Sequence, residues 1–128
     1  MYVARRKGDR IPVLIKVLNN YQEREEIIKT EIGIMKLLSG HDNFTHILDV
    51  YLFRNEVWVI SEYCDAGILV DFIAVSMMRE YEVAYIAREI LHGLNYLHEN
   101  NQIHRGNHIL LCSGNLRTLI AFLFYNYF

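Results

Sequence analysis

Residues 57–67 read VWVISEYCDAG, an apolar run that closes with an Ala-Gly pair. A second such run, ILDVYLF, occupies residues 47–53, and residues 54–56 (RNE) separate the two. Two short runs rich in β-branched and aromatic residues with so short a separator predict a β-hairpin. The hairpin strands are expected at 47–53 and 57–62, and the other elements are placed around them.

A strand and a helix are predicted before this hairpin. Residues 13–18 (VLIKVL) directly follow Pro12, which is tolerated at the first residue of a strand. Residues 23–38 predict a helix, since acidic side chains crowd the first turns and apolar side chains recur on one face.

Helices follow the hairpin. Residues 70–78 predict a short helix, and residues 80–99 predict a long one because their apolar positions repeat with a period of 3.6. A short strand is expected at 109–111, with a turn and a last apolar run after it. Strands and helices are largely segregated along the chain, which predicts an α+β fold.

The composition narrows the classes of protein. A length of 128 residues and a formal net charge of −2 fit one globular domain and argue against a nucleic-acid binder. No unbroken apolar run approaches the length of about 18 residues that a membrane span needs, and the first ten residues lack the apolar stretch of a signal peptide. Cys64 and Cys112 fit a reducing setting better than a disulfide framework, so a cytoplasmic location is expected.

Several segments, in order, resemble the motifs of protein kinases. They are VLIK at 13–16 (the V-A-I-K strand), Glu31 on the next helix, VWVISEYCDAG at 57–67 (the fifth strand and hinge), AYIAREILHGLNYLH at 84–98 (the long helix before the catalytic loop) and IHR at 103–105 (the I-H-R-D motif). The wording of the hinge and long helix is most similar to germinal-centre-type Ser/Thr kinases, including the misshapen/NIK-like and myosin-III kinase domains.

The resemblance covers about residues 1–124 and implies a particular layout. It places an N-lobe with helix C at about 1–62, a hinge at 63–67 and a partial C-lobe at 68–128. The first helices of the C-lobe are present, and the chain is expected to stop before the activation segment, which would leave the long helix partly exposed unless the apolar tail at 116–128 covers it.

The same resemblance implies a nucleotide site with ATP and Mg²⁺ as cofactors. Lys16, held by Glu31, would offer its ammonium group to the phosphates, and the hinge would offer backbone groups to adenine. The implied nucleotide-binding residues are Lys16, Glu31, Ser61 (at the gatekeeper position), Glu62, Cys64 and Leu110. On composition alone, Lys16 would be a surface residue at a strand end and Glu31 one more helix charge.

The catalytic loop departs from the kinase pattern. The family reads H-R-D-x-K-x-x-N, whereas this chain runs from His104 and Arg105 straight to Gly106 and Asn107. The catalytic Asp and the loop Lys are missing, so His104 and Arg105 are remnants, and His108 occupies the place of the metal-binding Asn. Phosphoryl transfer depends on these positioning groups.

Two further departures concern the metal and the phosphates. Ala121 stands where the family's D-F-G has its Asp, and a methyl group cannot coordinate Mg²⁺. Residues 1–3 match the end of the glycine-rich loop, but its glycines are absent. No intact metal site is therefore expected.

Three functions stay open at this point. The first is a degenerate kinase-like domain without phosphotransfer, whose role in signalling would be to bind a protein partner through helix C or the apolar tail. The second is a fragment of an active ATP-dependent Ser/Thr protein kinase. The third is an unstable product with no function.

Overall fold

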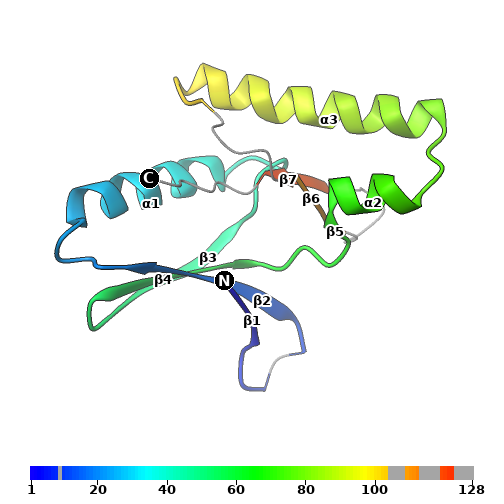
Figure 1. Ribbon diagram of the computed structural model, residues 1–128. Coiled ribbons are helices and arrows are strands. Elements are labelled where there is room, and N and C mark those ends of the chain that lie inside the picture. Colours follow the sequence, from blue (N-terminus) through cyan, green and yellow to red (C-terminus); the bar gives the residue numbers. More distant parts are fainter. Residues whose placement is uncertain (9, 104–108, 113–118, 123–128) are drawn as a thin grey trace. The chain divides into compact units, whose positions relative to one another are not determined.

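The computed structural model describes residues 1–8, 10–103, 109–112 and 119–122, the last two ranges by their backbone (Figure 1). The chain forms two compact units. The first unit comprises Met1–Gly40 and His46–Tyr63, and the second comprises His41–Thr45 and Cys64–Phe128.

The first unit is built on an antiparallel sheet with the strand order β1-β2-β4-β3. Its strands are β1 (Tyr2–Arg5), β2 (Pro12–Asn19), β3 (Ile47–Phe53) and β4 (Glu56–Glu62). The predicted hairpin is confirmed, but Glu56 belongs to β4, which shortens the turn to Arg54 and Asn55. Arg54 has a positive φ of 55°, which lets so short a turn reverse the chain.

Helix α1 (Glu25–Leu38) packs on this sheet. Ile28 is 1% exposed and forms the core with Val57 and Val59 of β4. The helix begins two residues later than predicted, because the N–H groups of Glu23 and Arg24 donate to the carbonyl of Asn20 in a preceding turn.

The second unit holds two helices and a small antiparallel sheet with the order β5-β6-β7. The elements are β5 (Gly67–Ile68), α2 (Leu69–Val75), α3 (Glu80–Glu99), β6 (Ile109–Cys112) and β7 (Leu119–Phe122). The predicted bounds of α3 are confirmed. Helix α2 ends before the predicted residue 78, because Ser76 is already extended (φ −112°, ψ 132°). None of the helices in the described ranges has both the length and the apolar character that a bilayer span requires.

The apolar stripe of α3 is partly exposed, as expected. Leu97 is fully buried, and Ile86 and Ile90 pack against Leu69 of α2. At the start of the helix, Val83 is 51% exposed, so the expected exposure is found there but not at Leu97. The contact with α2 buries part of the stripe within the second unit.

The loop after α1 contributes to the core of the second unit. Phe44 is 2% exposed, and the ring of His41 stacks on Tyr96 of α3 with 4.4 Å between centroids. The side-chain amide of Asn43, itself buried, donates to Oε2 of Glu89 at 3.1 Å. Residues 41–45, predicted from the sequence only as part of a loop, are therefore an anchor for this unit.

The expectation of reduced cysteines is wrong for Cys64, which is disulfide-bonded in the structure. No feature of the sequence around Cys64 predicts this bond.

Candidate functional site

An ion pair joins β2 to α1 inside the first unit. The Nζ atom of Lys16 donates to Oε1 of Glu31 at 2.6 Å. The two side chains are only 13% and 5% exposed, respectively. The composition-based alternative, a surface lysine and an ordinary helix charge, is therefore wrong for both residues.

Helix periodicity explains why Glu31 is buried. Glu31 lies three residues after Ile28 and seven before Leu38, so all three share the face of α1 that meets the sheet. On the sheet, Lys16 pairs with Val59, which belongs to the same core as Ile28. A buried carboxylate needs a charged or hydrogen-bonding partner, and Lys16 is placed to supply it.

Ser61 lies on the same strand face as Val59. It is 7% exposed and pairs with Leu14 of β2, two residues before Lys16. The register therefore puts Ser61 on the same side of the sheet as the ion pair. Its role at a nucleotide remains a prediction.

Glu62 is engaged in hydrogen bonds within the first unit. Its N–H donates to the carbonyl of His46 at 3.0 Å, and its Oε1 accepts from the N–H of His46 at 2.8 Å. Nδ1 of His46 also lies 3.1 Å from that oxygen. The N–H of Glu62 is thus used within the first unit, and the role of this residue at a hinge stays a prediction.

The other residues implied by the resemblance belong to the second unit. Cys64 is 6% exposed and disulfide-bonded. Leu110 and Ala121 are backbone partners in the β6–β7 ladder, and their side chains lie outside the description. His104, Arg105 and His108 lie outside the described residues, as does most of the apolar tail at 116–128.

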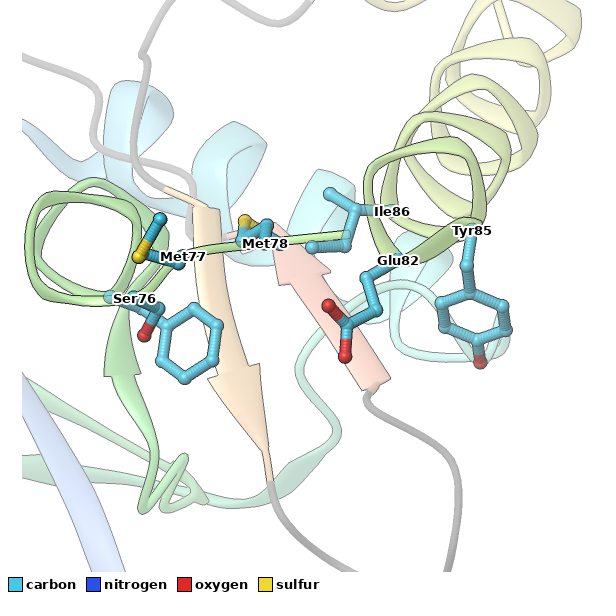
Figure 2. A pocket seen from close by; sticks show the side chains of 7 residues that line it. Ser76, Met77, Met78, Glu82, Tyr85 and Ile86 are labelled. Carbon is cyan, nitrogen blue, oxygen red and sulfur yellow. The ribbon is translucent and has the colours of Figure 1, made fainter. Parts of the chain in front are cut away.

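The second unit also contains a pocket of about 220 Å³ between α2 and the start of α3 (Figure 2). It is lined by Phe72, Ser76, Met77, Met78, Glu82, Tyr85 and Ile86. Glu82 is the one charged residue among them, and its Oε2 accepts from the N–H of Arg79 at 2.7 Å. This carboxylate is therefore engaged in capping α3. The rest of the lining is mainly apolar, so the pocket brings no set of catalytic groups together.

The two residues that the resemblance places at the Mg²⁺ site are poor ligands for that ion. Among the side chains that the structure describes, no three His, Cys, Asp or Glu residues are grouped so as to hold a metal ion. The sequence has His108 and Ala121 at the positions where the resemblance implies metal ligands. An alanine offers no oxygen to a cation that requires oxygen ligands.

The electrostatics of the second unit centre on Glu89. Burial alone would raise the pKa of this carboxyl, but hydrogen bonds from Asn43 and Arg88 outweigh burial and hold the pKa below its usual value. The contact between Asn43 and Glu89 was not predicted from the sequence. The signal present there is Phe44, because a large aromatic residue in an otherwise polar loop indicates that the loop is buried.

The comparisons with known proteins agree with the architecture. The model of the protein kinase domain matches residues 1–109. Serine/threonine-protein kinase STE20 of Eremothecium gossypii is 36% identical over 122 residues, which cover 91% of this chain and 12% of that protein. Serine/threonine-protein kinase shk1/pak1 of Schizosaccharomyces pombe is 36% identical over 106 residues, 82% of this chain and 16% of that protein.

A third relative is serine/threonine-protein kinase SMU1 of Mycosarcoma maydis, 36% identical over 106 residues that cover 82% of this chain and 14% of that protein. The chain thus spans less than a fifth of the length of these relatives. Its sheet, its helices and the extent of these matches lead to one conclusion: the chain belongs to the protein kinase domain family.

Proposed function

We propose that this chain is a kinase-family domain without phosphotransfer activity, whose role is to bind a protein partner in signalling. The carrying observation is a contrast. Lys16 and Glu31 form the buried ion pair that active kinases use. In contrast, Gly106 directly follows Arg105, at the point where an active kinase has its catalytic Asp. The Asp is missing from the interior of the sequence, so its absence does not depend on where the chain begins or ends.

Kinases of this family use ATP and Mg²⁺, and in this proposal neither supports a reaction here. Lys16 could present its ammonium group to phosphate oxygens, but nothing in the pattern replaces the metal-binding Asp or the catalytic Asp. Because catalysis in this class is almost entirely positioning and charge stabilisation, losing these groups together removes it. In this proposal, the Lys16–Glu31 pair holds α1 on the sheet.

Helix α1 is the first candidate for partner binding. Ile27 and Leu37 of α1 are each 44% exposed, and apolar side chains on an accessible helix face suit a protein partner. The apolar tail at 116–128 is the second candidate. The proposal includes the finer kinship with germinal-centre-type kinases and a hinge at 63–67 between two lobes. It also includes a cytoplasmic location, against which the disulfide of Cys64 counts.

The test is a phosphotransfer assay on the purified chain with radiolabelled ATP, Mg²⁺ or Mn²⁺, and a generic basic protein substrate. We expect no transfer above that of Lys16→Ala, with an active Ste20-type kinase domain as the positive control. Metal-dependent transfer that disappears in Lys16→Ala would overturn the proposal. A thermal melt with and without Mg-ATP should show little or no shift.

The alternative is that the chain is a fragment of an active Ser/Thr protein kinase. The names of the relatives and the small share of their length that the chain spans favour it. A transcript read across Gly106 separates the two proposals. An Asp-x-Lys sequence restored at that point would favour the active enzyme, and the sequence as printed would favour the inactive domain.

A further inference from the structure

Strand β3 is an edge of the four-stranded sheet, since β4 is its sheet neighbour within the described part of the chain. Exposed edge strands commonly carry lysine, proline or inward-pointing charges that prevent pairing with another chain. In β3 the single charged residue is Asp49, and four large apolar residues are at least half exposed. These are Leu48 (57%), Tyr51 (50%), Leu52 (61%) and Phe53 (54%).

The outer hydrogen-bonding groups of β3 can be identified. The N–H of Val50 donates to Oδ1 of its neighbour Asp49 at 2.9 Å, so it does not point into the β4 ladder. In antiparallel pairs the inward and outward directions alternate, so the N–H and C=O groups of Leu52 also point outward. A register shift between Ile47 and Asp49 ends the regular part of the strand. The regular edge therefore runs from Asp49 to Phe53.

We propose that a second copy of this chain adds to this edge, with the two β3 strands antiparallel about a twofold axis at Tyr51. In this register Val50 and Leu52 of one copy exchange backbone hydrogen bonds with Leu52 and Val50 of the other. Tyr51 then lies opposite Tyr51, and each Val50 lies opposite a Leu52. The C=O groups of Val50 and Leu52 and the N–H of Leu52 obtain partners in this way, and the N–H of Val50 exchanges its bond to Asp49 for one to the other copy.

Charge complementarity favours a second copy over an unrelated strand. The guanidinium carbon of Arg54 lies 5.1 Å from the centre of the Phe53 ring, so its charge sits over that ring. In the proposed register Phe53 of one copy lies opposite Asp49 of the other, so Arg54 meets the Asp49 carboxylate. The twofold axis repeats this contact. The hydroxyl of Tyr51, which is the largest influence holding the pKa of Asp49 below its usual range, keeps donating to this carboxylate in the proposed register.

The first test is sedimentation of the full chain over a range of concentrations. We expect a reversible dimer, weakened about tenfold or more by Leu52→Lys, because two apolar cross-strand pairs are lost per dimer. The matched control is Val70→Lys, which puts the same charge on an exposed apolar residue (67%) of α2 and should leave the dimer unchanged. A chain that stays monomeric at about 100 μM, or equal dimerisation of Leu52→Lys and the unmodified chain, would overturn the proposal.

The second test reads the register and the charge contact. Residues at the axis of an antiparallel pair lie within disulfide reach, so Tyr51→Cys should form an intermolecular disulfide under mild oxidation, and Leu52→Cys should not. Arg54→Glu should weaken the dimer, and the exchanged pair Asp49→Lys with Arg54→Glu should restore it. Crosslinking of Leu52→Cys at the rate of Tyr51→Cys, or no rescue by the exchange, contradicts this register.

Discussion

Removing one member of the Lys16–Glu31 pair should cost far more stability than removing both. At the observed 2.6 Å separation, two unit charges attract by about 6 kcal/mol at an effective dielectric constant of about 20. Desolvation of the two mostly buried side chains offsets much of this attraction, so the intact pair contributes little net stability. If Lys16 becomes Met, however, the Glu31 carboxylate stays buried without its cation. We expect Lys16→Met to lower the free energy of unfolding by about 3 kcal/mol.

The assay is urea-induced unfolding of the full chain, followed by the fluorescence of its single tryptophan, Trp58, in the same sheet. The double variant Lys16→Met with Glu31→Leu should regain most of the loss. Lys29→Met is the matched control, since it removes an exposed pair with Glu25 and should cost far less than Lys16→Met. The reasoning is refuted if Lys16→Met costs no more than Lys29→Met, or if the two single losses simply add in the double variant.

Two further predictions concern packing and pH. Ile28→Ala should lower the free energy of unfolding by about 3 kcal/mol, because it leaves a cavity in the core. Ile27→Ala, on the exposed side of the same helix, should cost well under half as much. Equal losses of stability in urea unfolding would contradict the assigned core. Glu89 has a lower pKa folded than its ordinary value of 4.5, so its contribution is present at neutral pH and is lost as the pH falls below that value. Asn43→Ala should reduce this acid sensitivity in melts between pH 7 and pH 3, and an unchanged pH profile would exclude the Asn43–Glu89 contact as its source.

The sequence predicts elements well where one periodic signal dominates. Residues 80–99 have a continuous helical stripe, and the helix has those bounds in the structure. Strands β1 and β5 were not predicted, because they are short and are defined by their partners in the sheet. The end of α2 was placed too late because Met77 and Met78 suit a helix, and the extended backbone at Ser76 could not be read from residue types.

The candidate site likewise contains residues that could be predicted from the sequence and contacts that could not. Residues that a local motif identifies, such as Lys16 and Glu31, could be named from the sequence, and the structure brings them together. The engagement of the Glu62 carboxylate with His46 depends on a register shift in β3 and has no local signature. The Asn43–Glu89 contact joins residues 46 positions apart, and neither residue type indicates the other.

The assignment of residues 41–45 to the second unit has a consequence for recombination and for limited proteolysis. The backbone passes from one unit to the other after Gly40, after Thr45 and after Tyr63, so neither unit is a continuous segment of the gene. A crossover or a cut at Tyr63 would separate Phe44, which has the largest fully buried side chain among the described residues, from the rest of its unit. In a chimera of two divergent relatives joined at that point, the second unit would pack correctly only if residues 41–45 came from the same parent as α3.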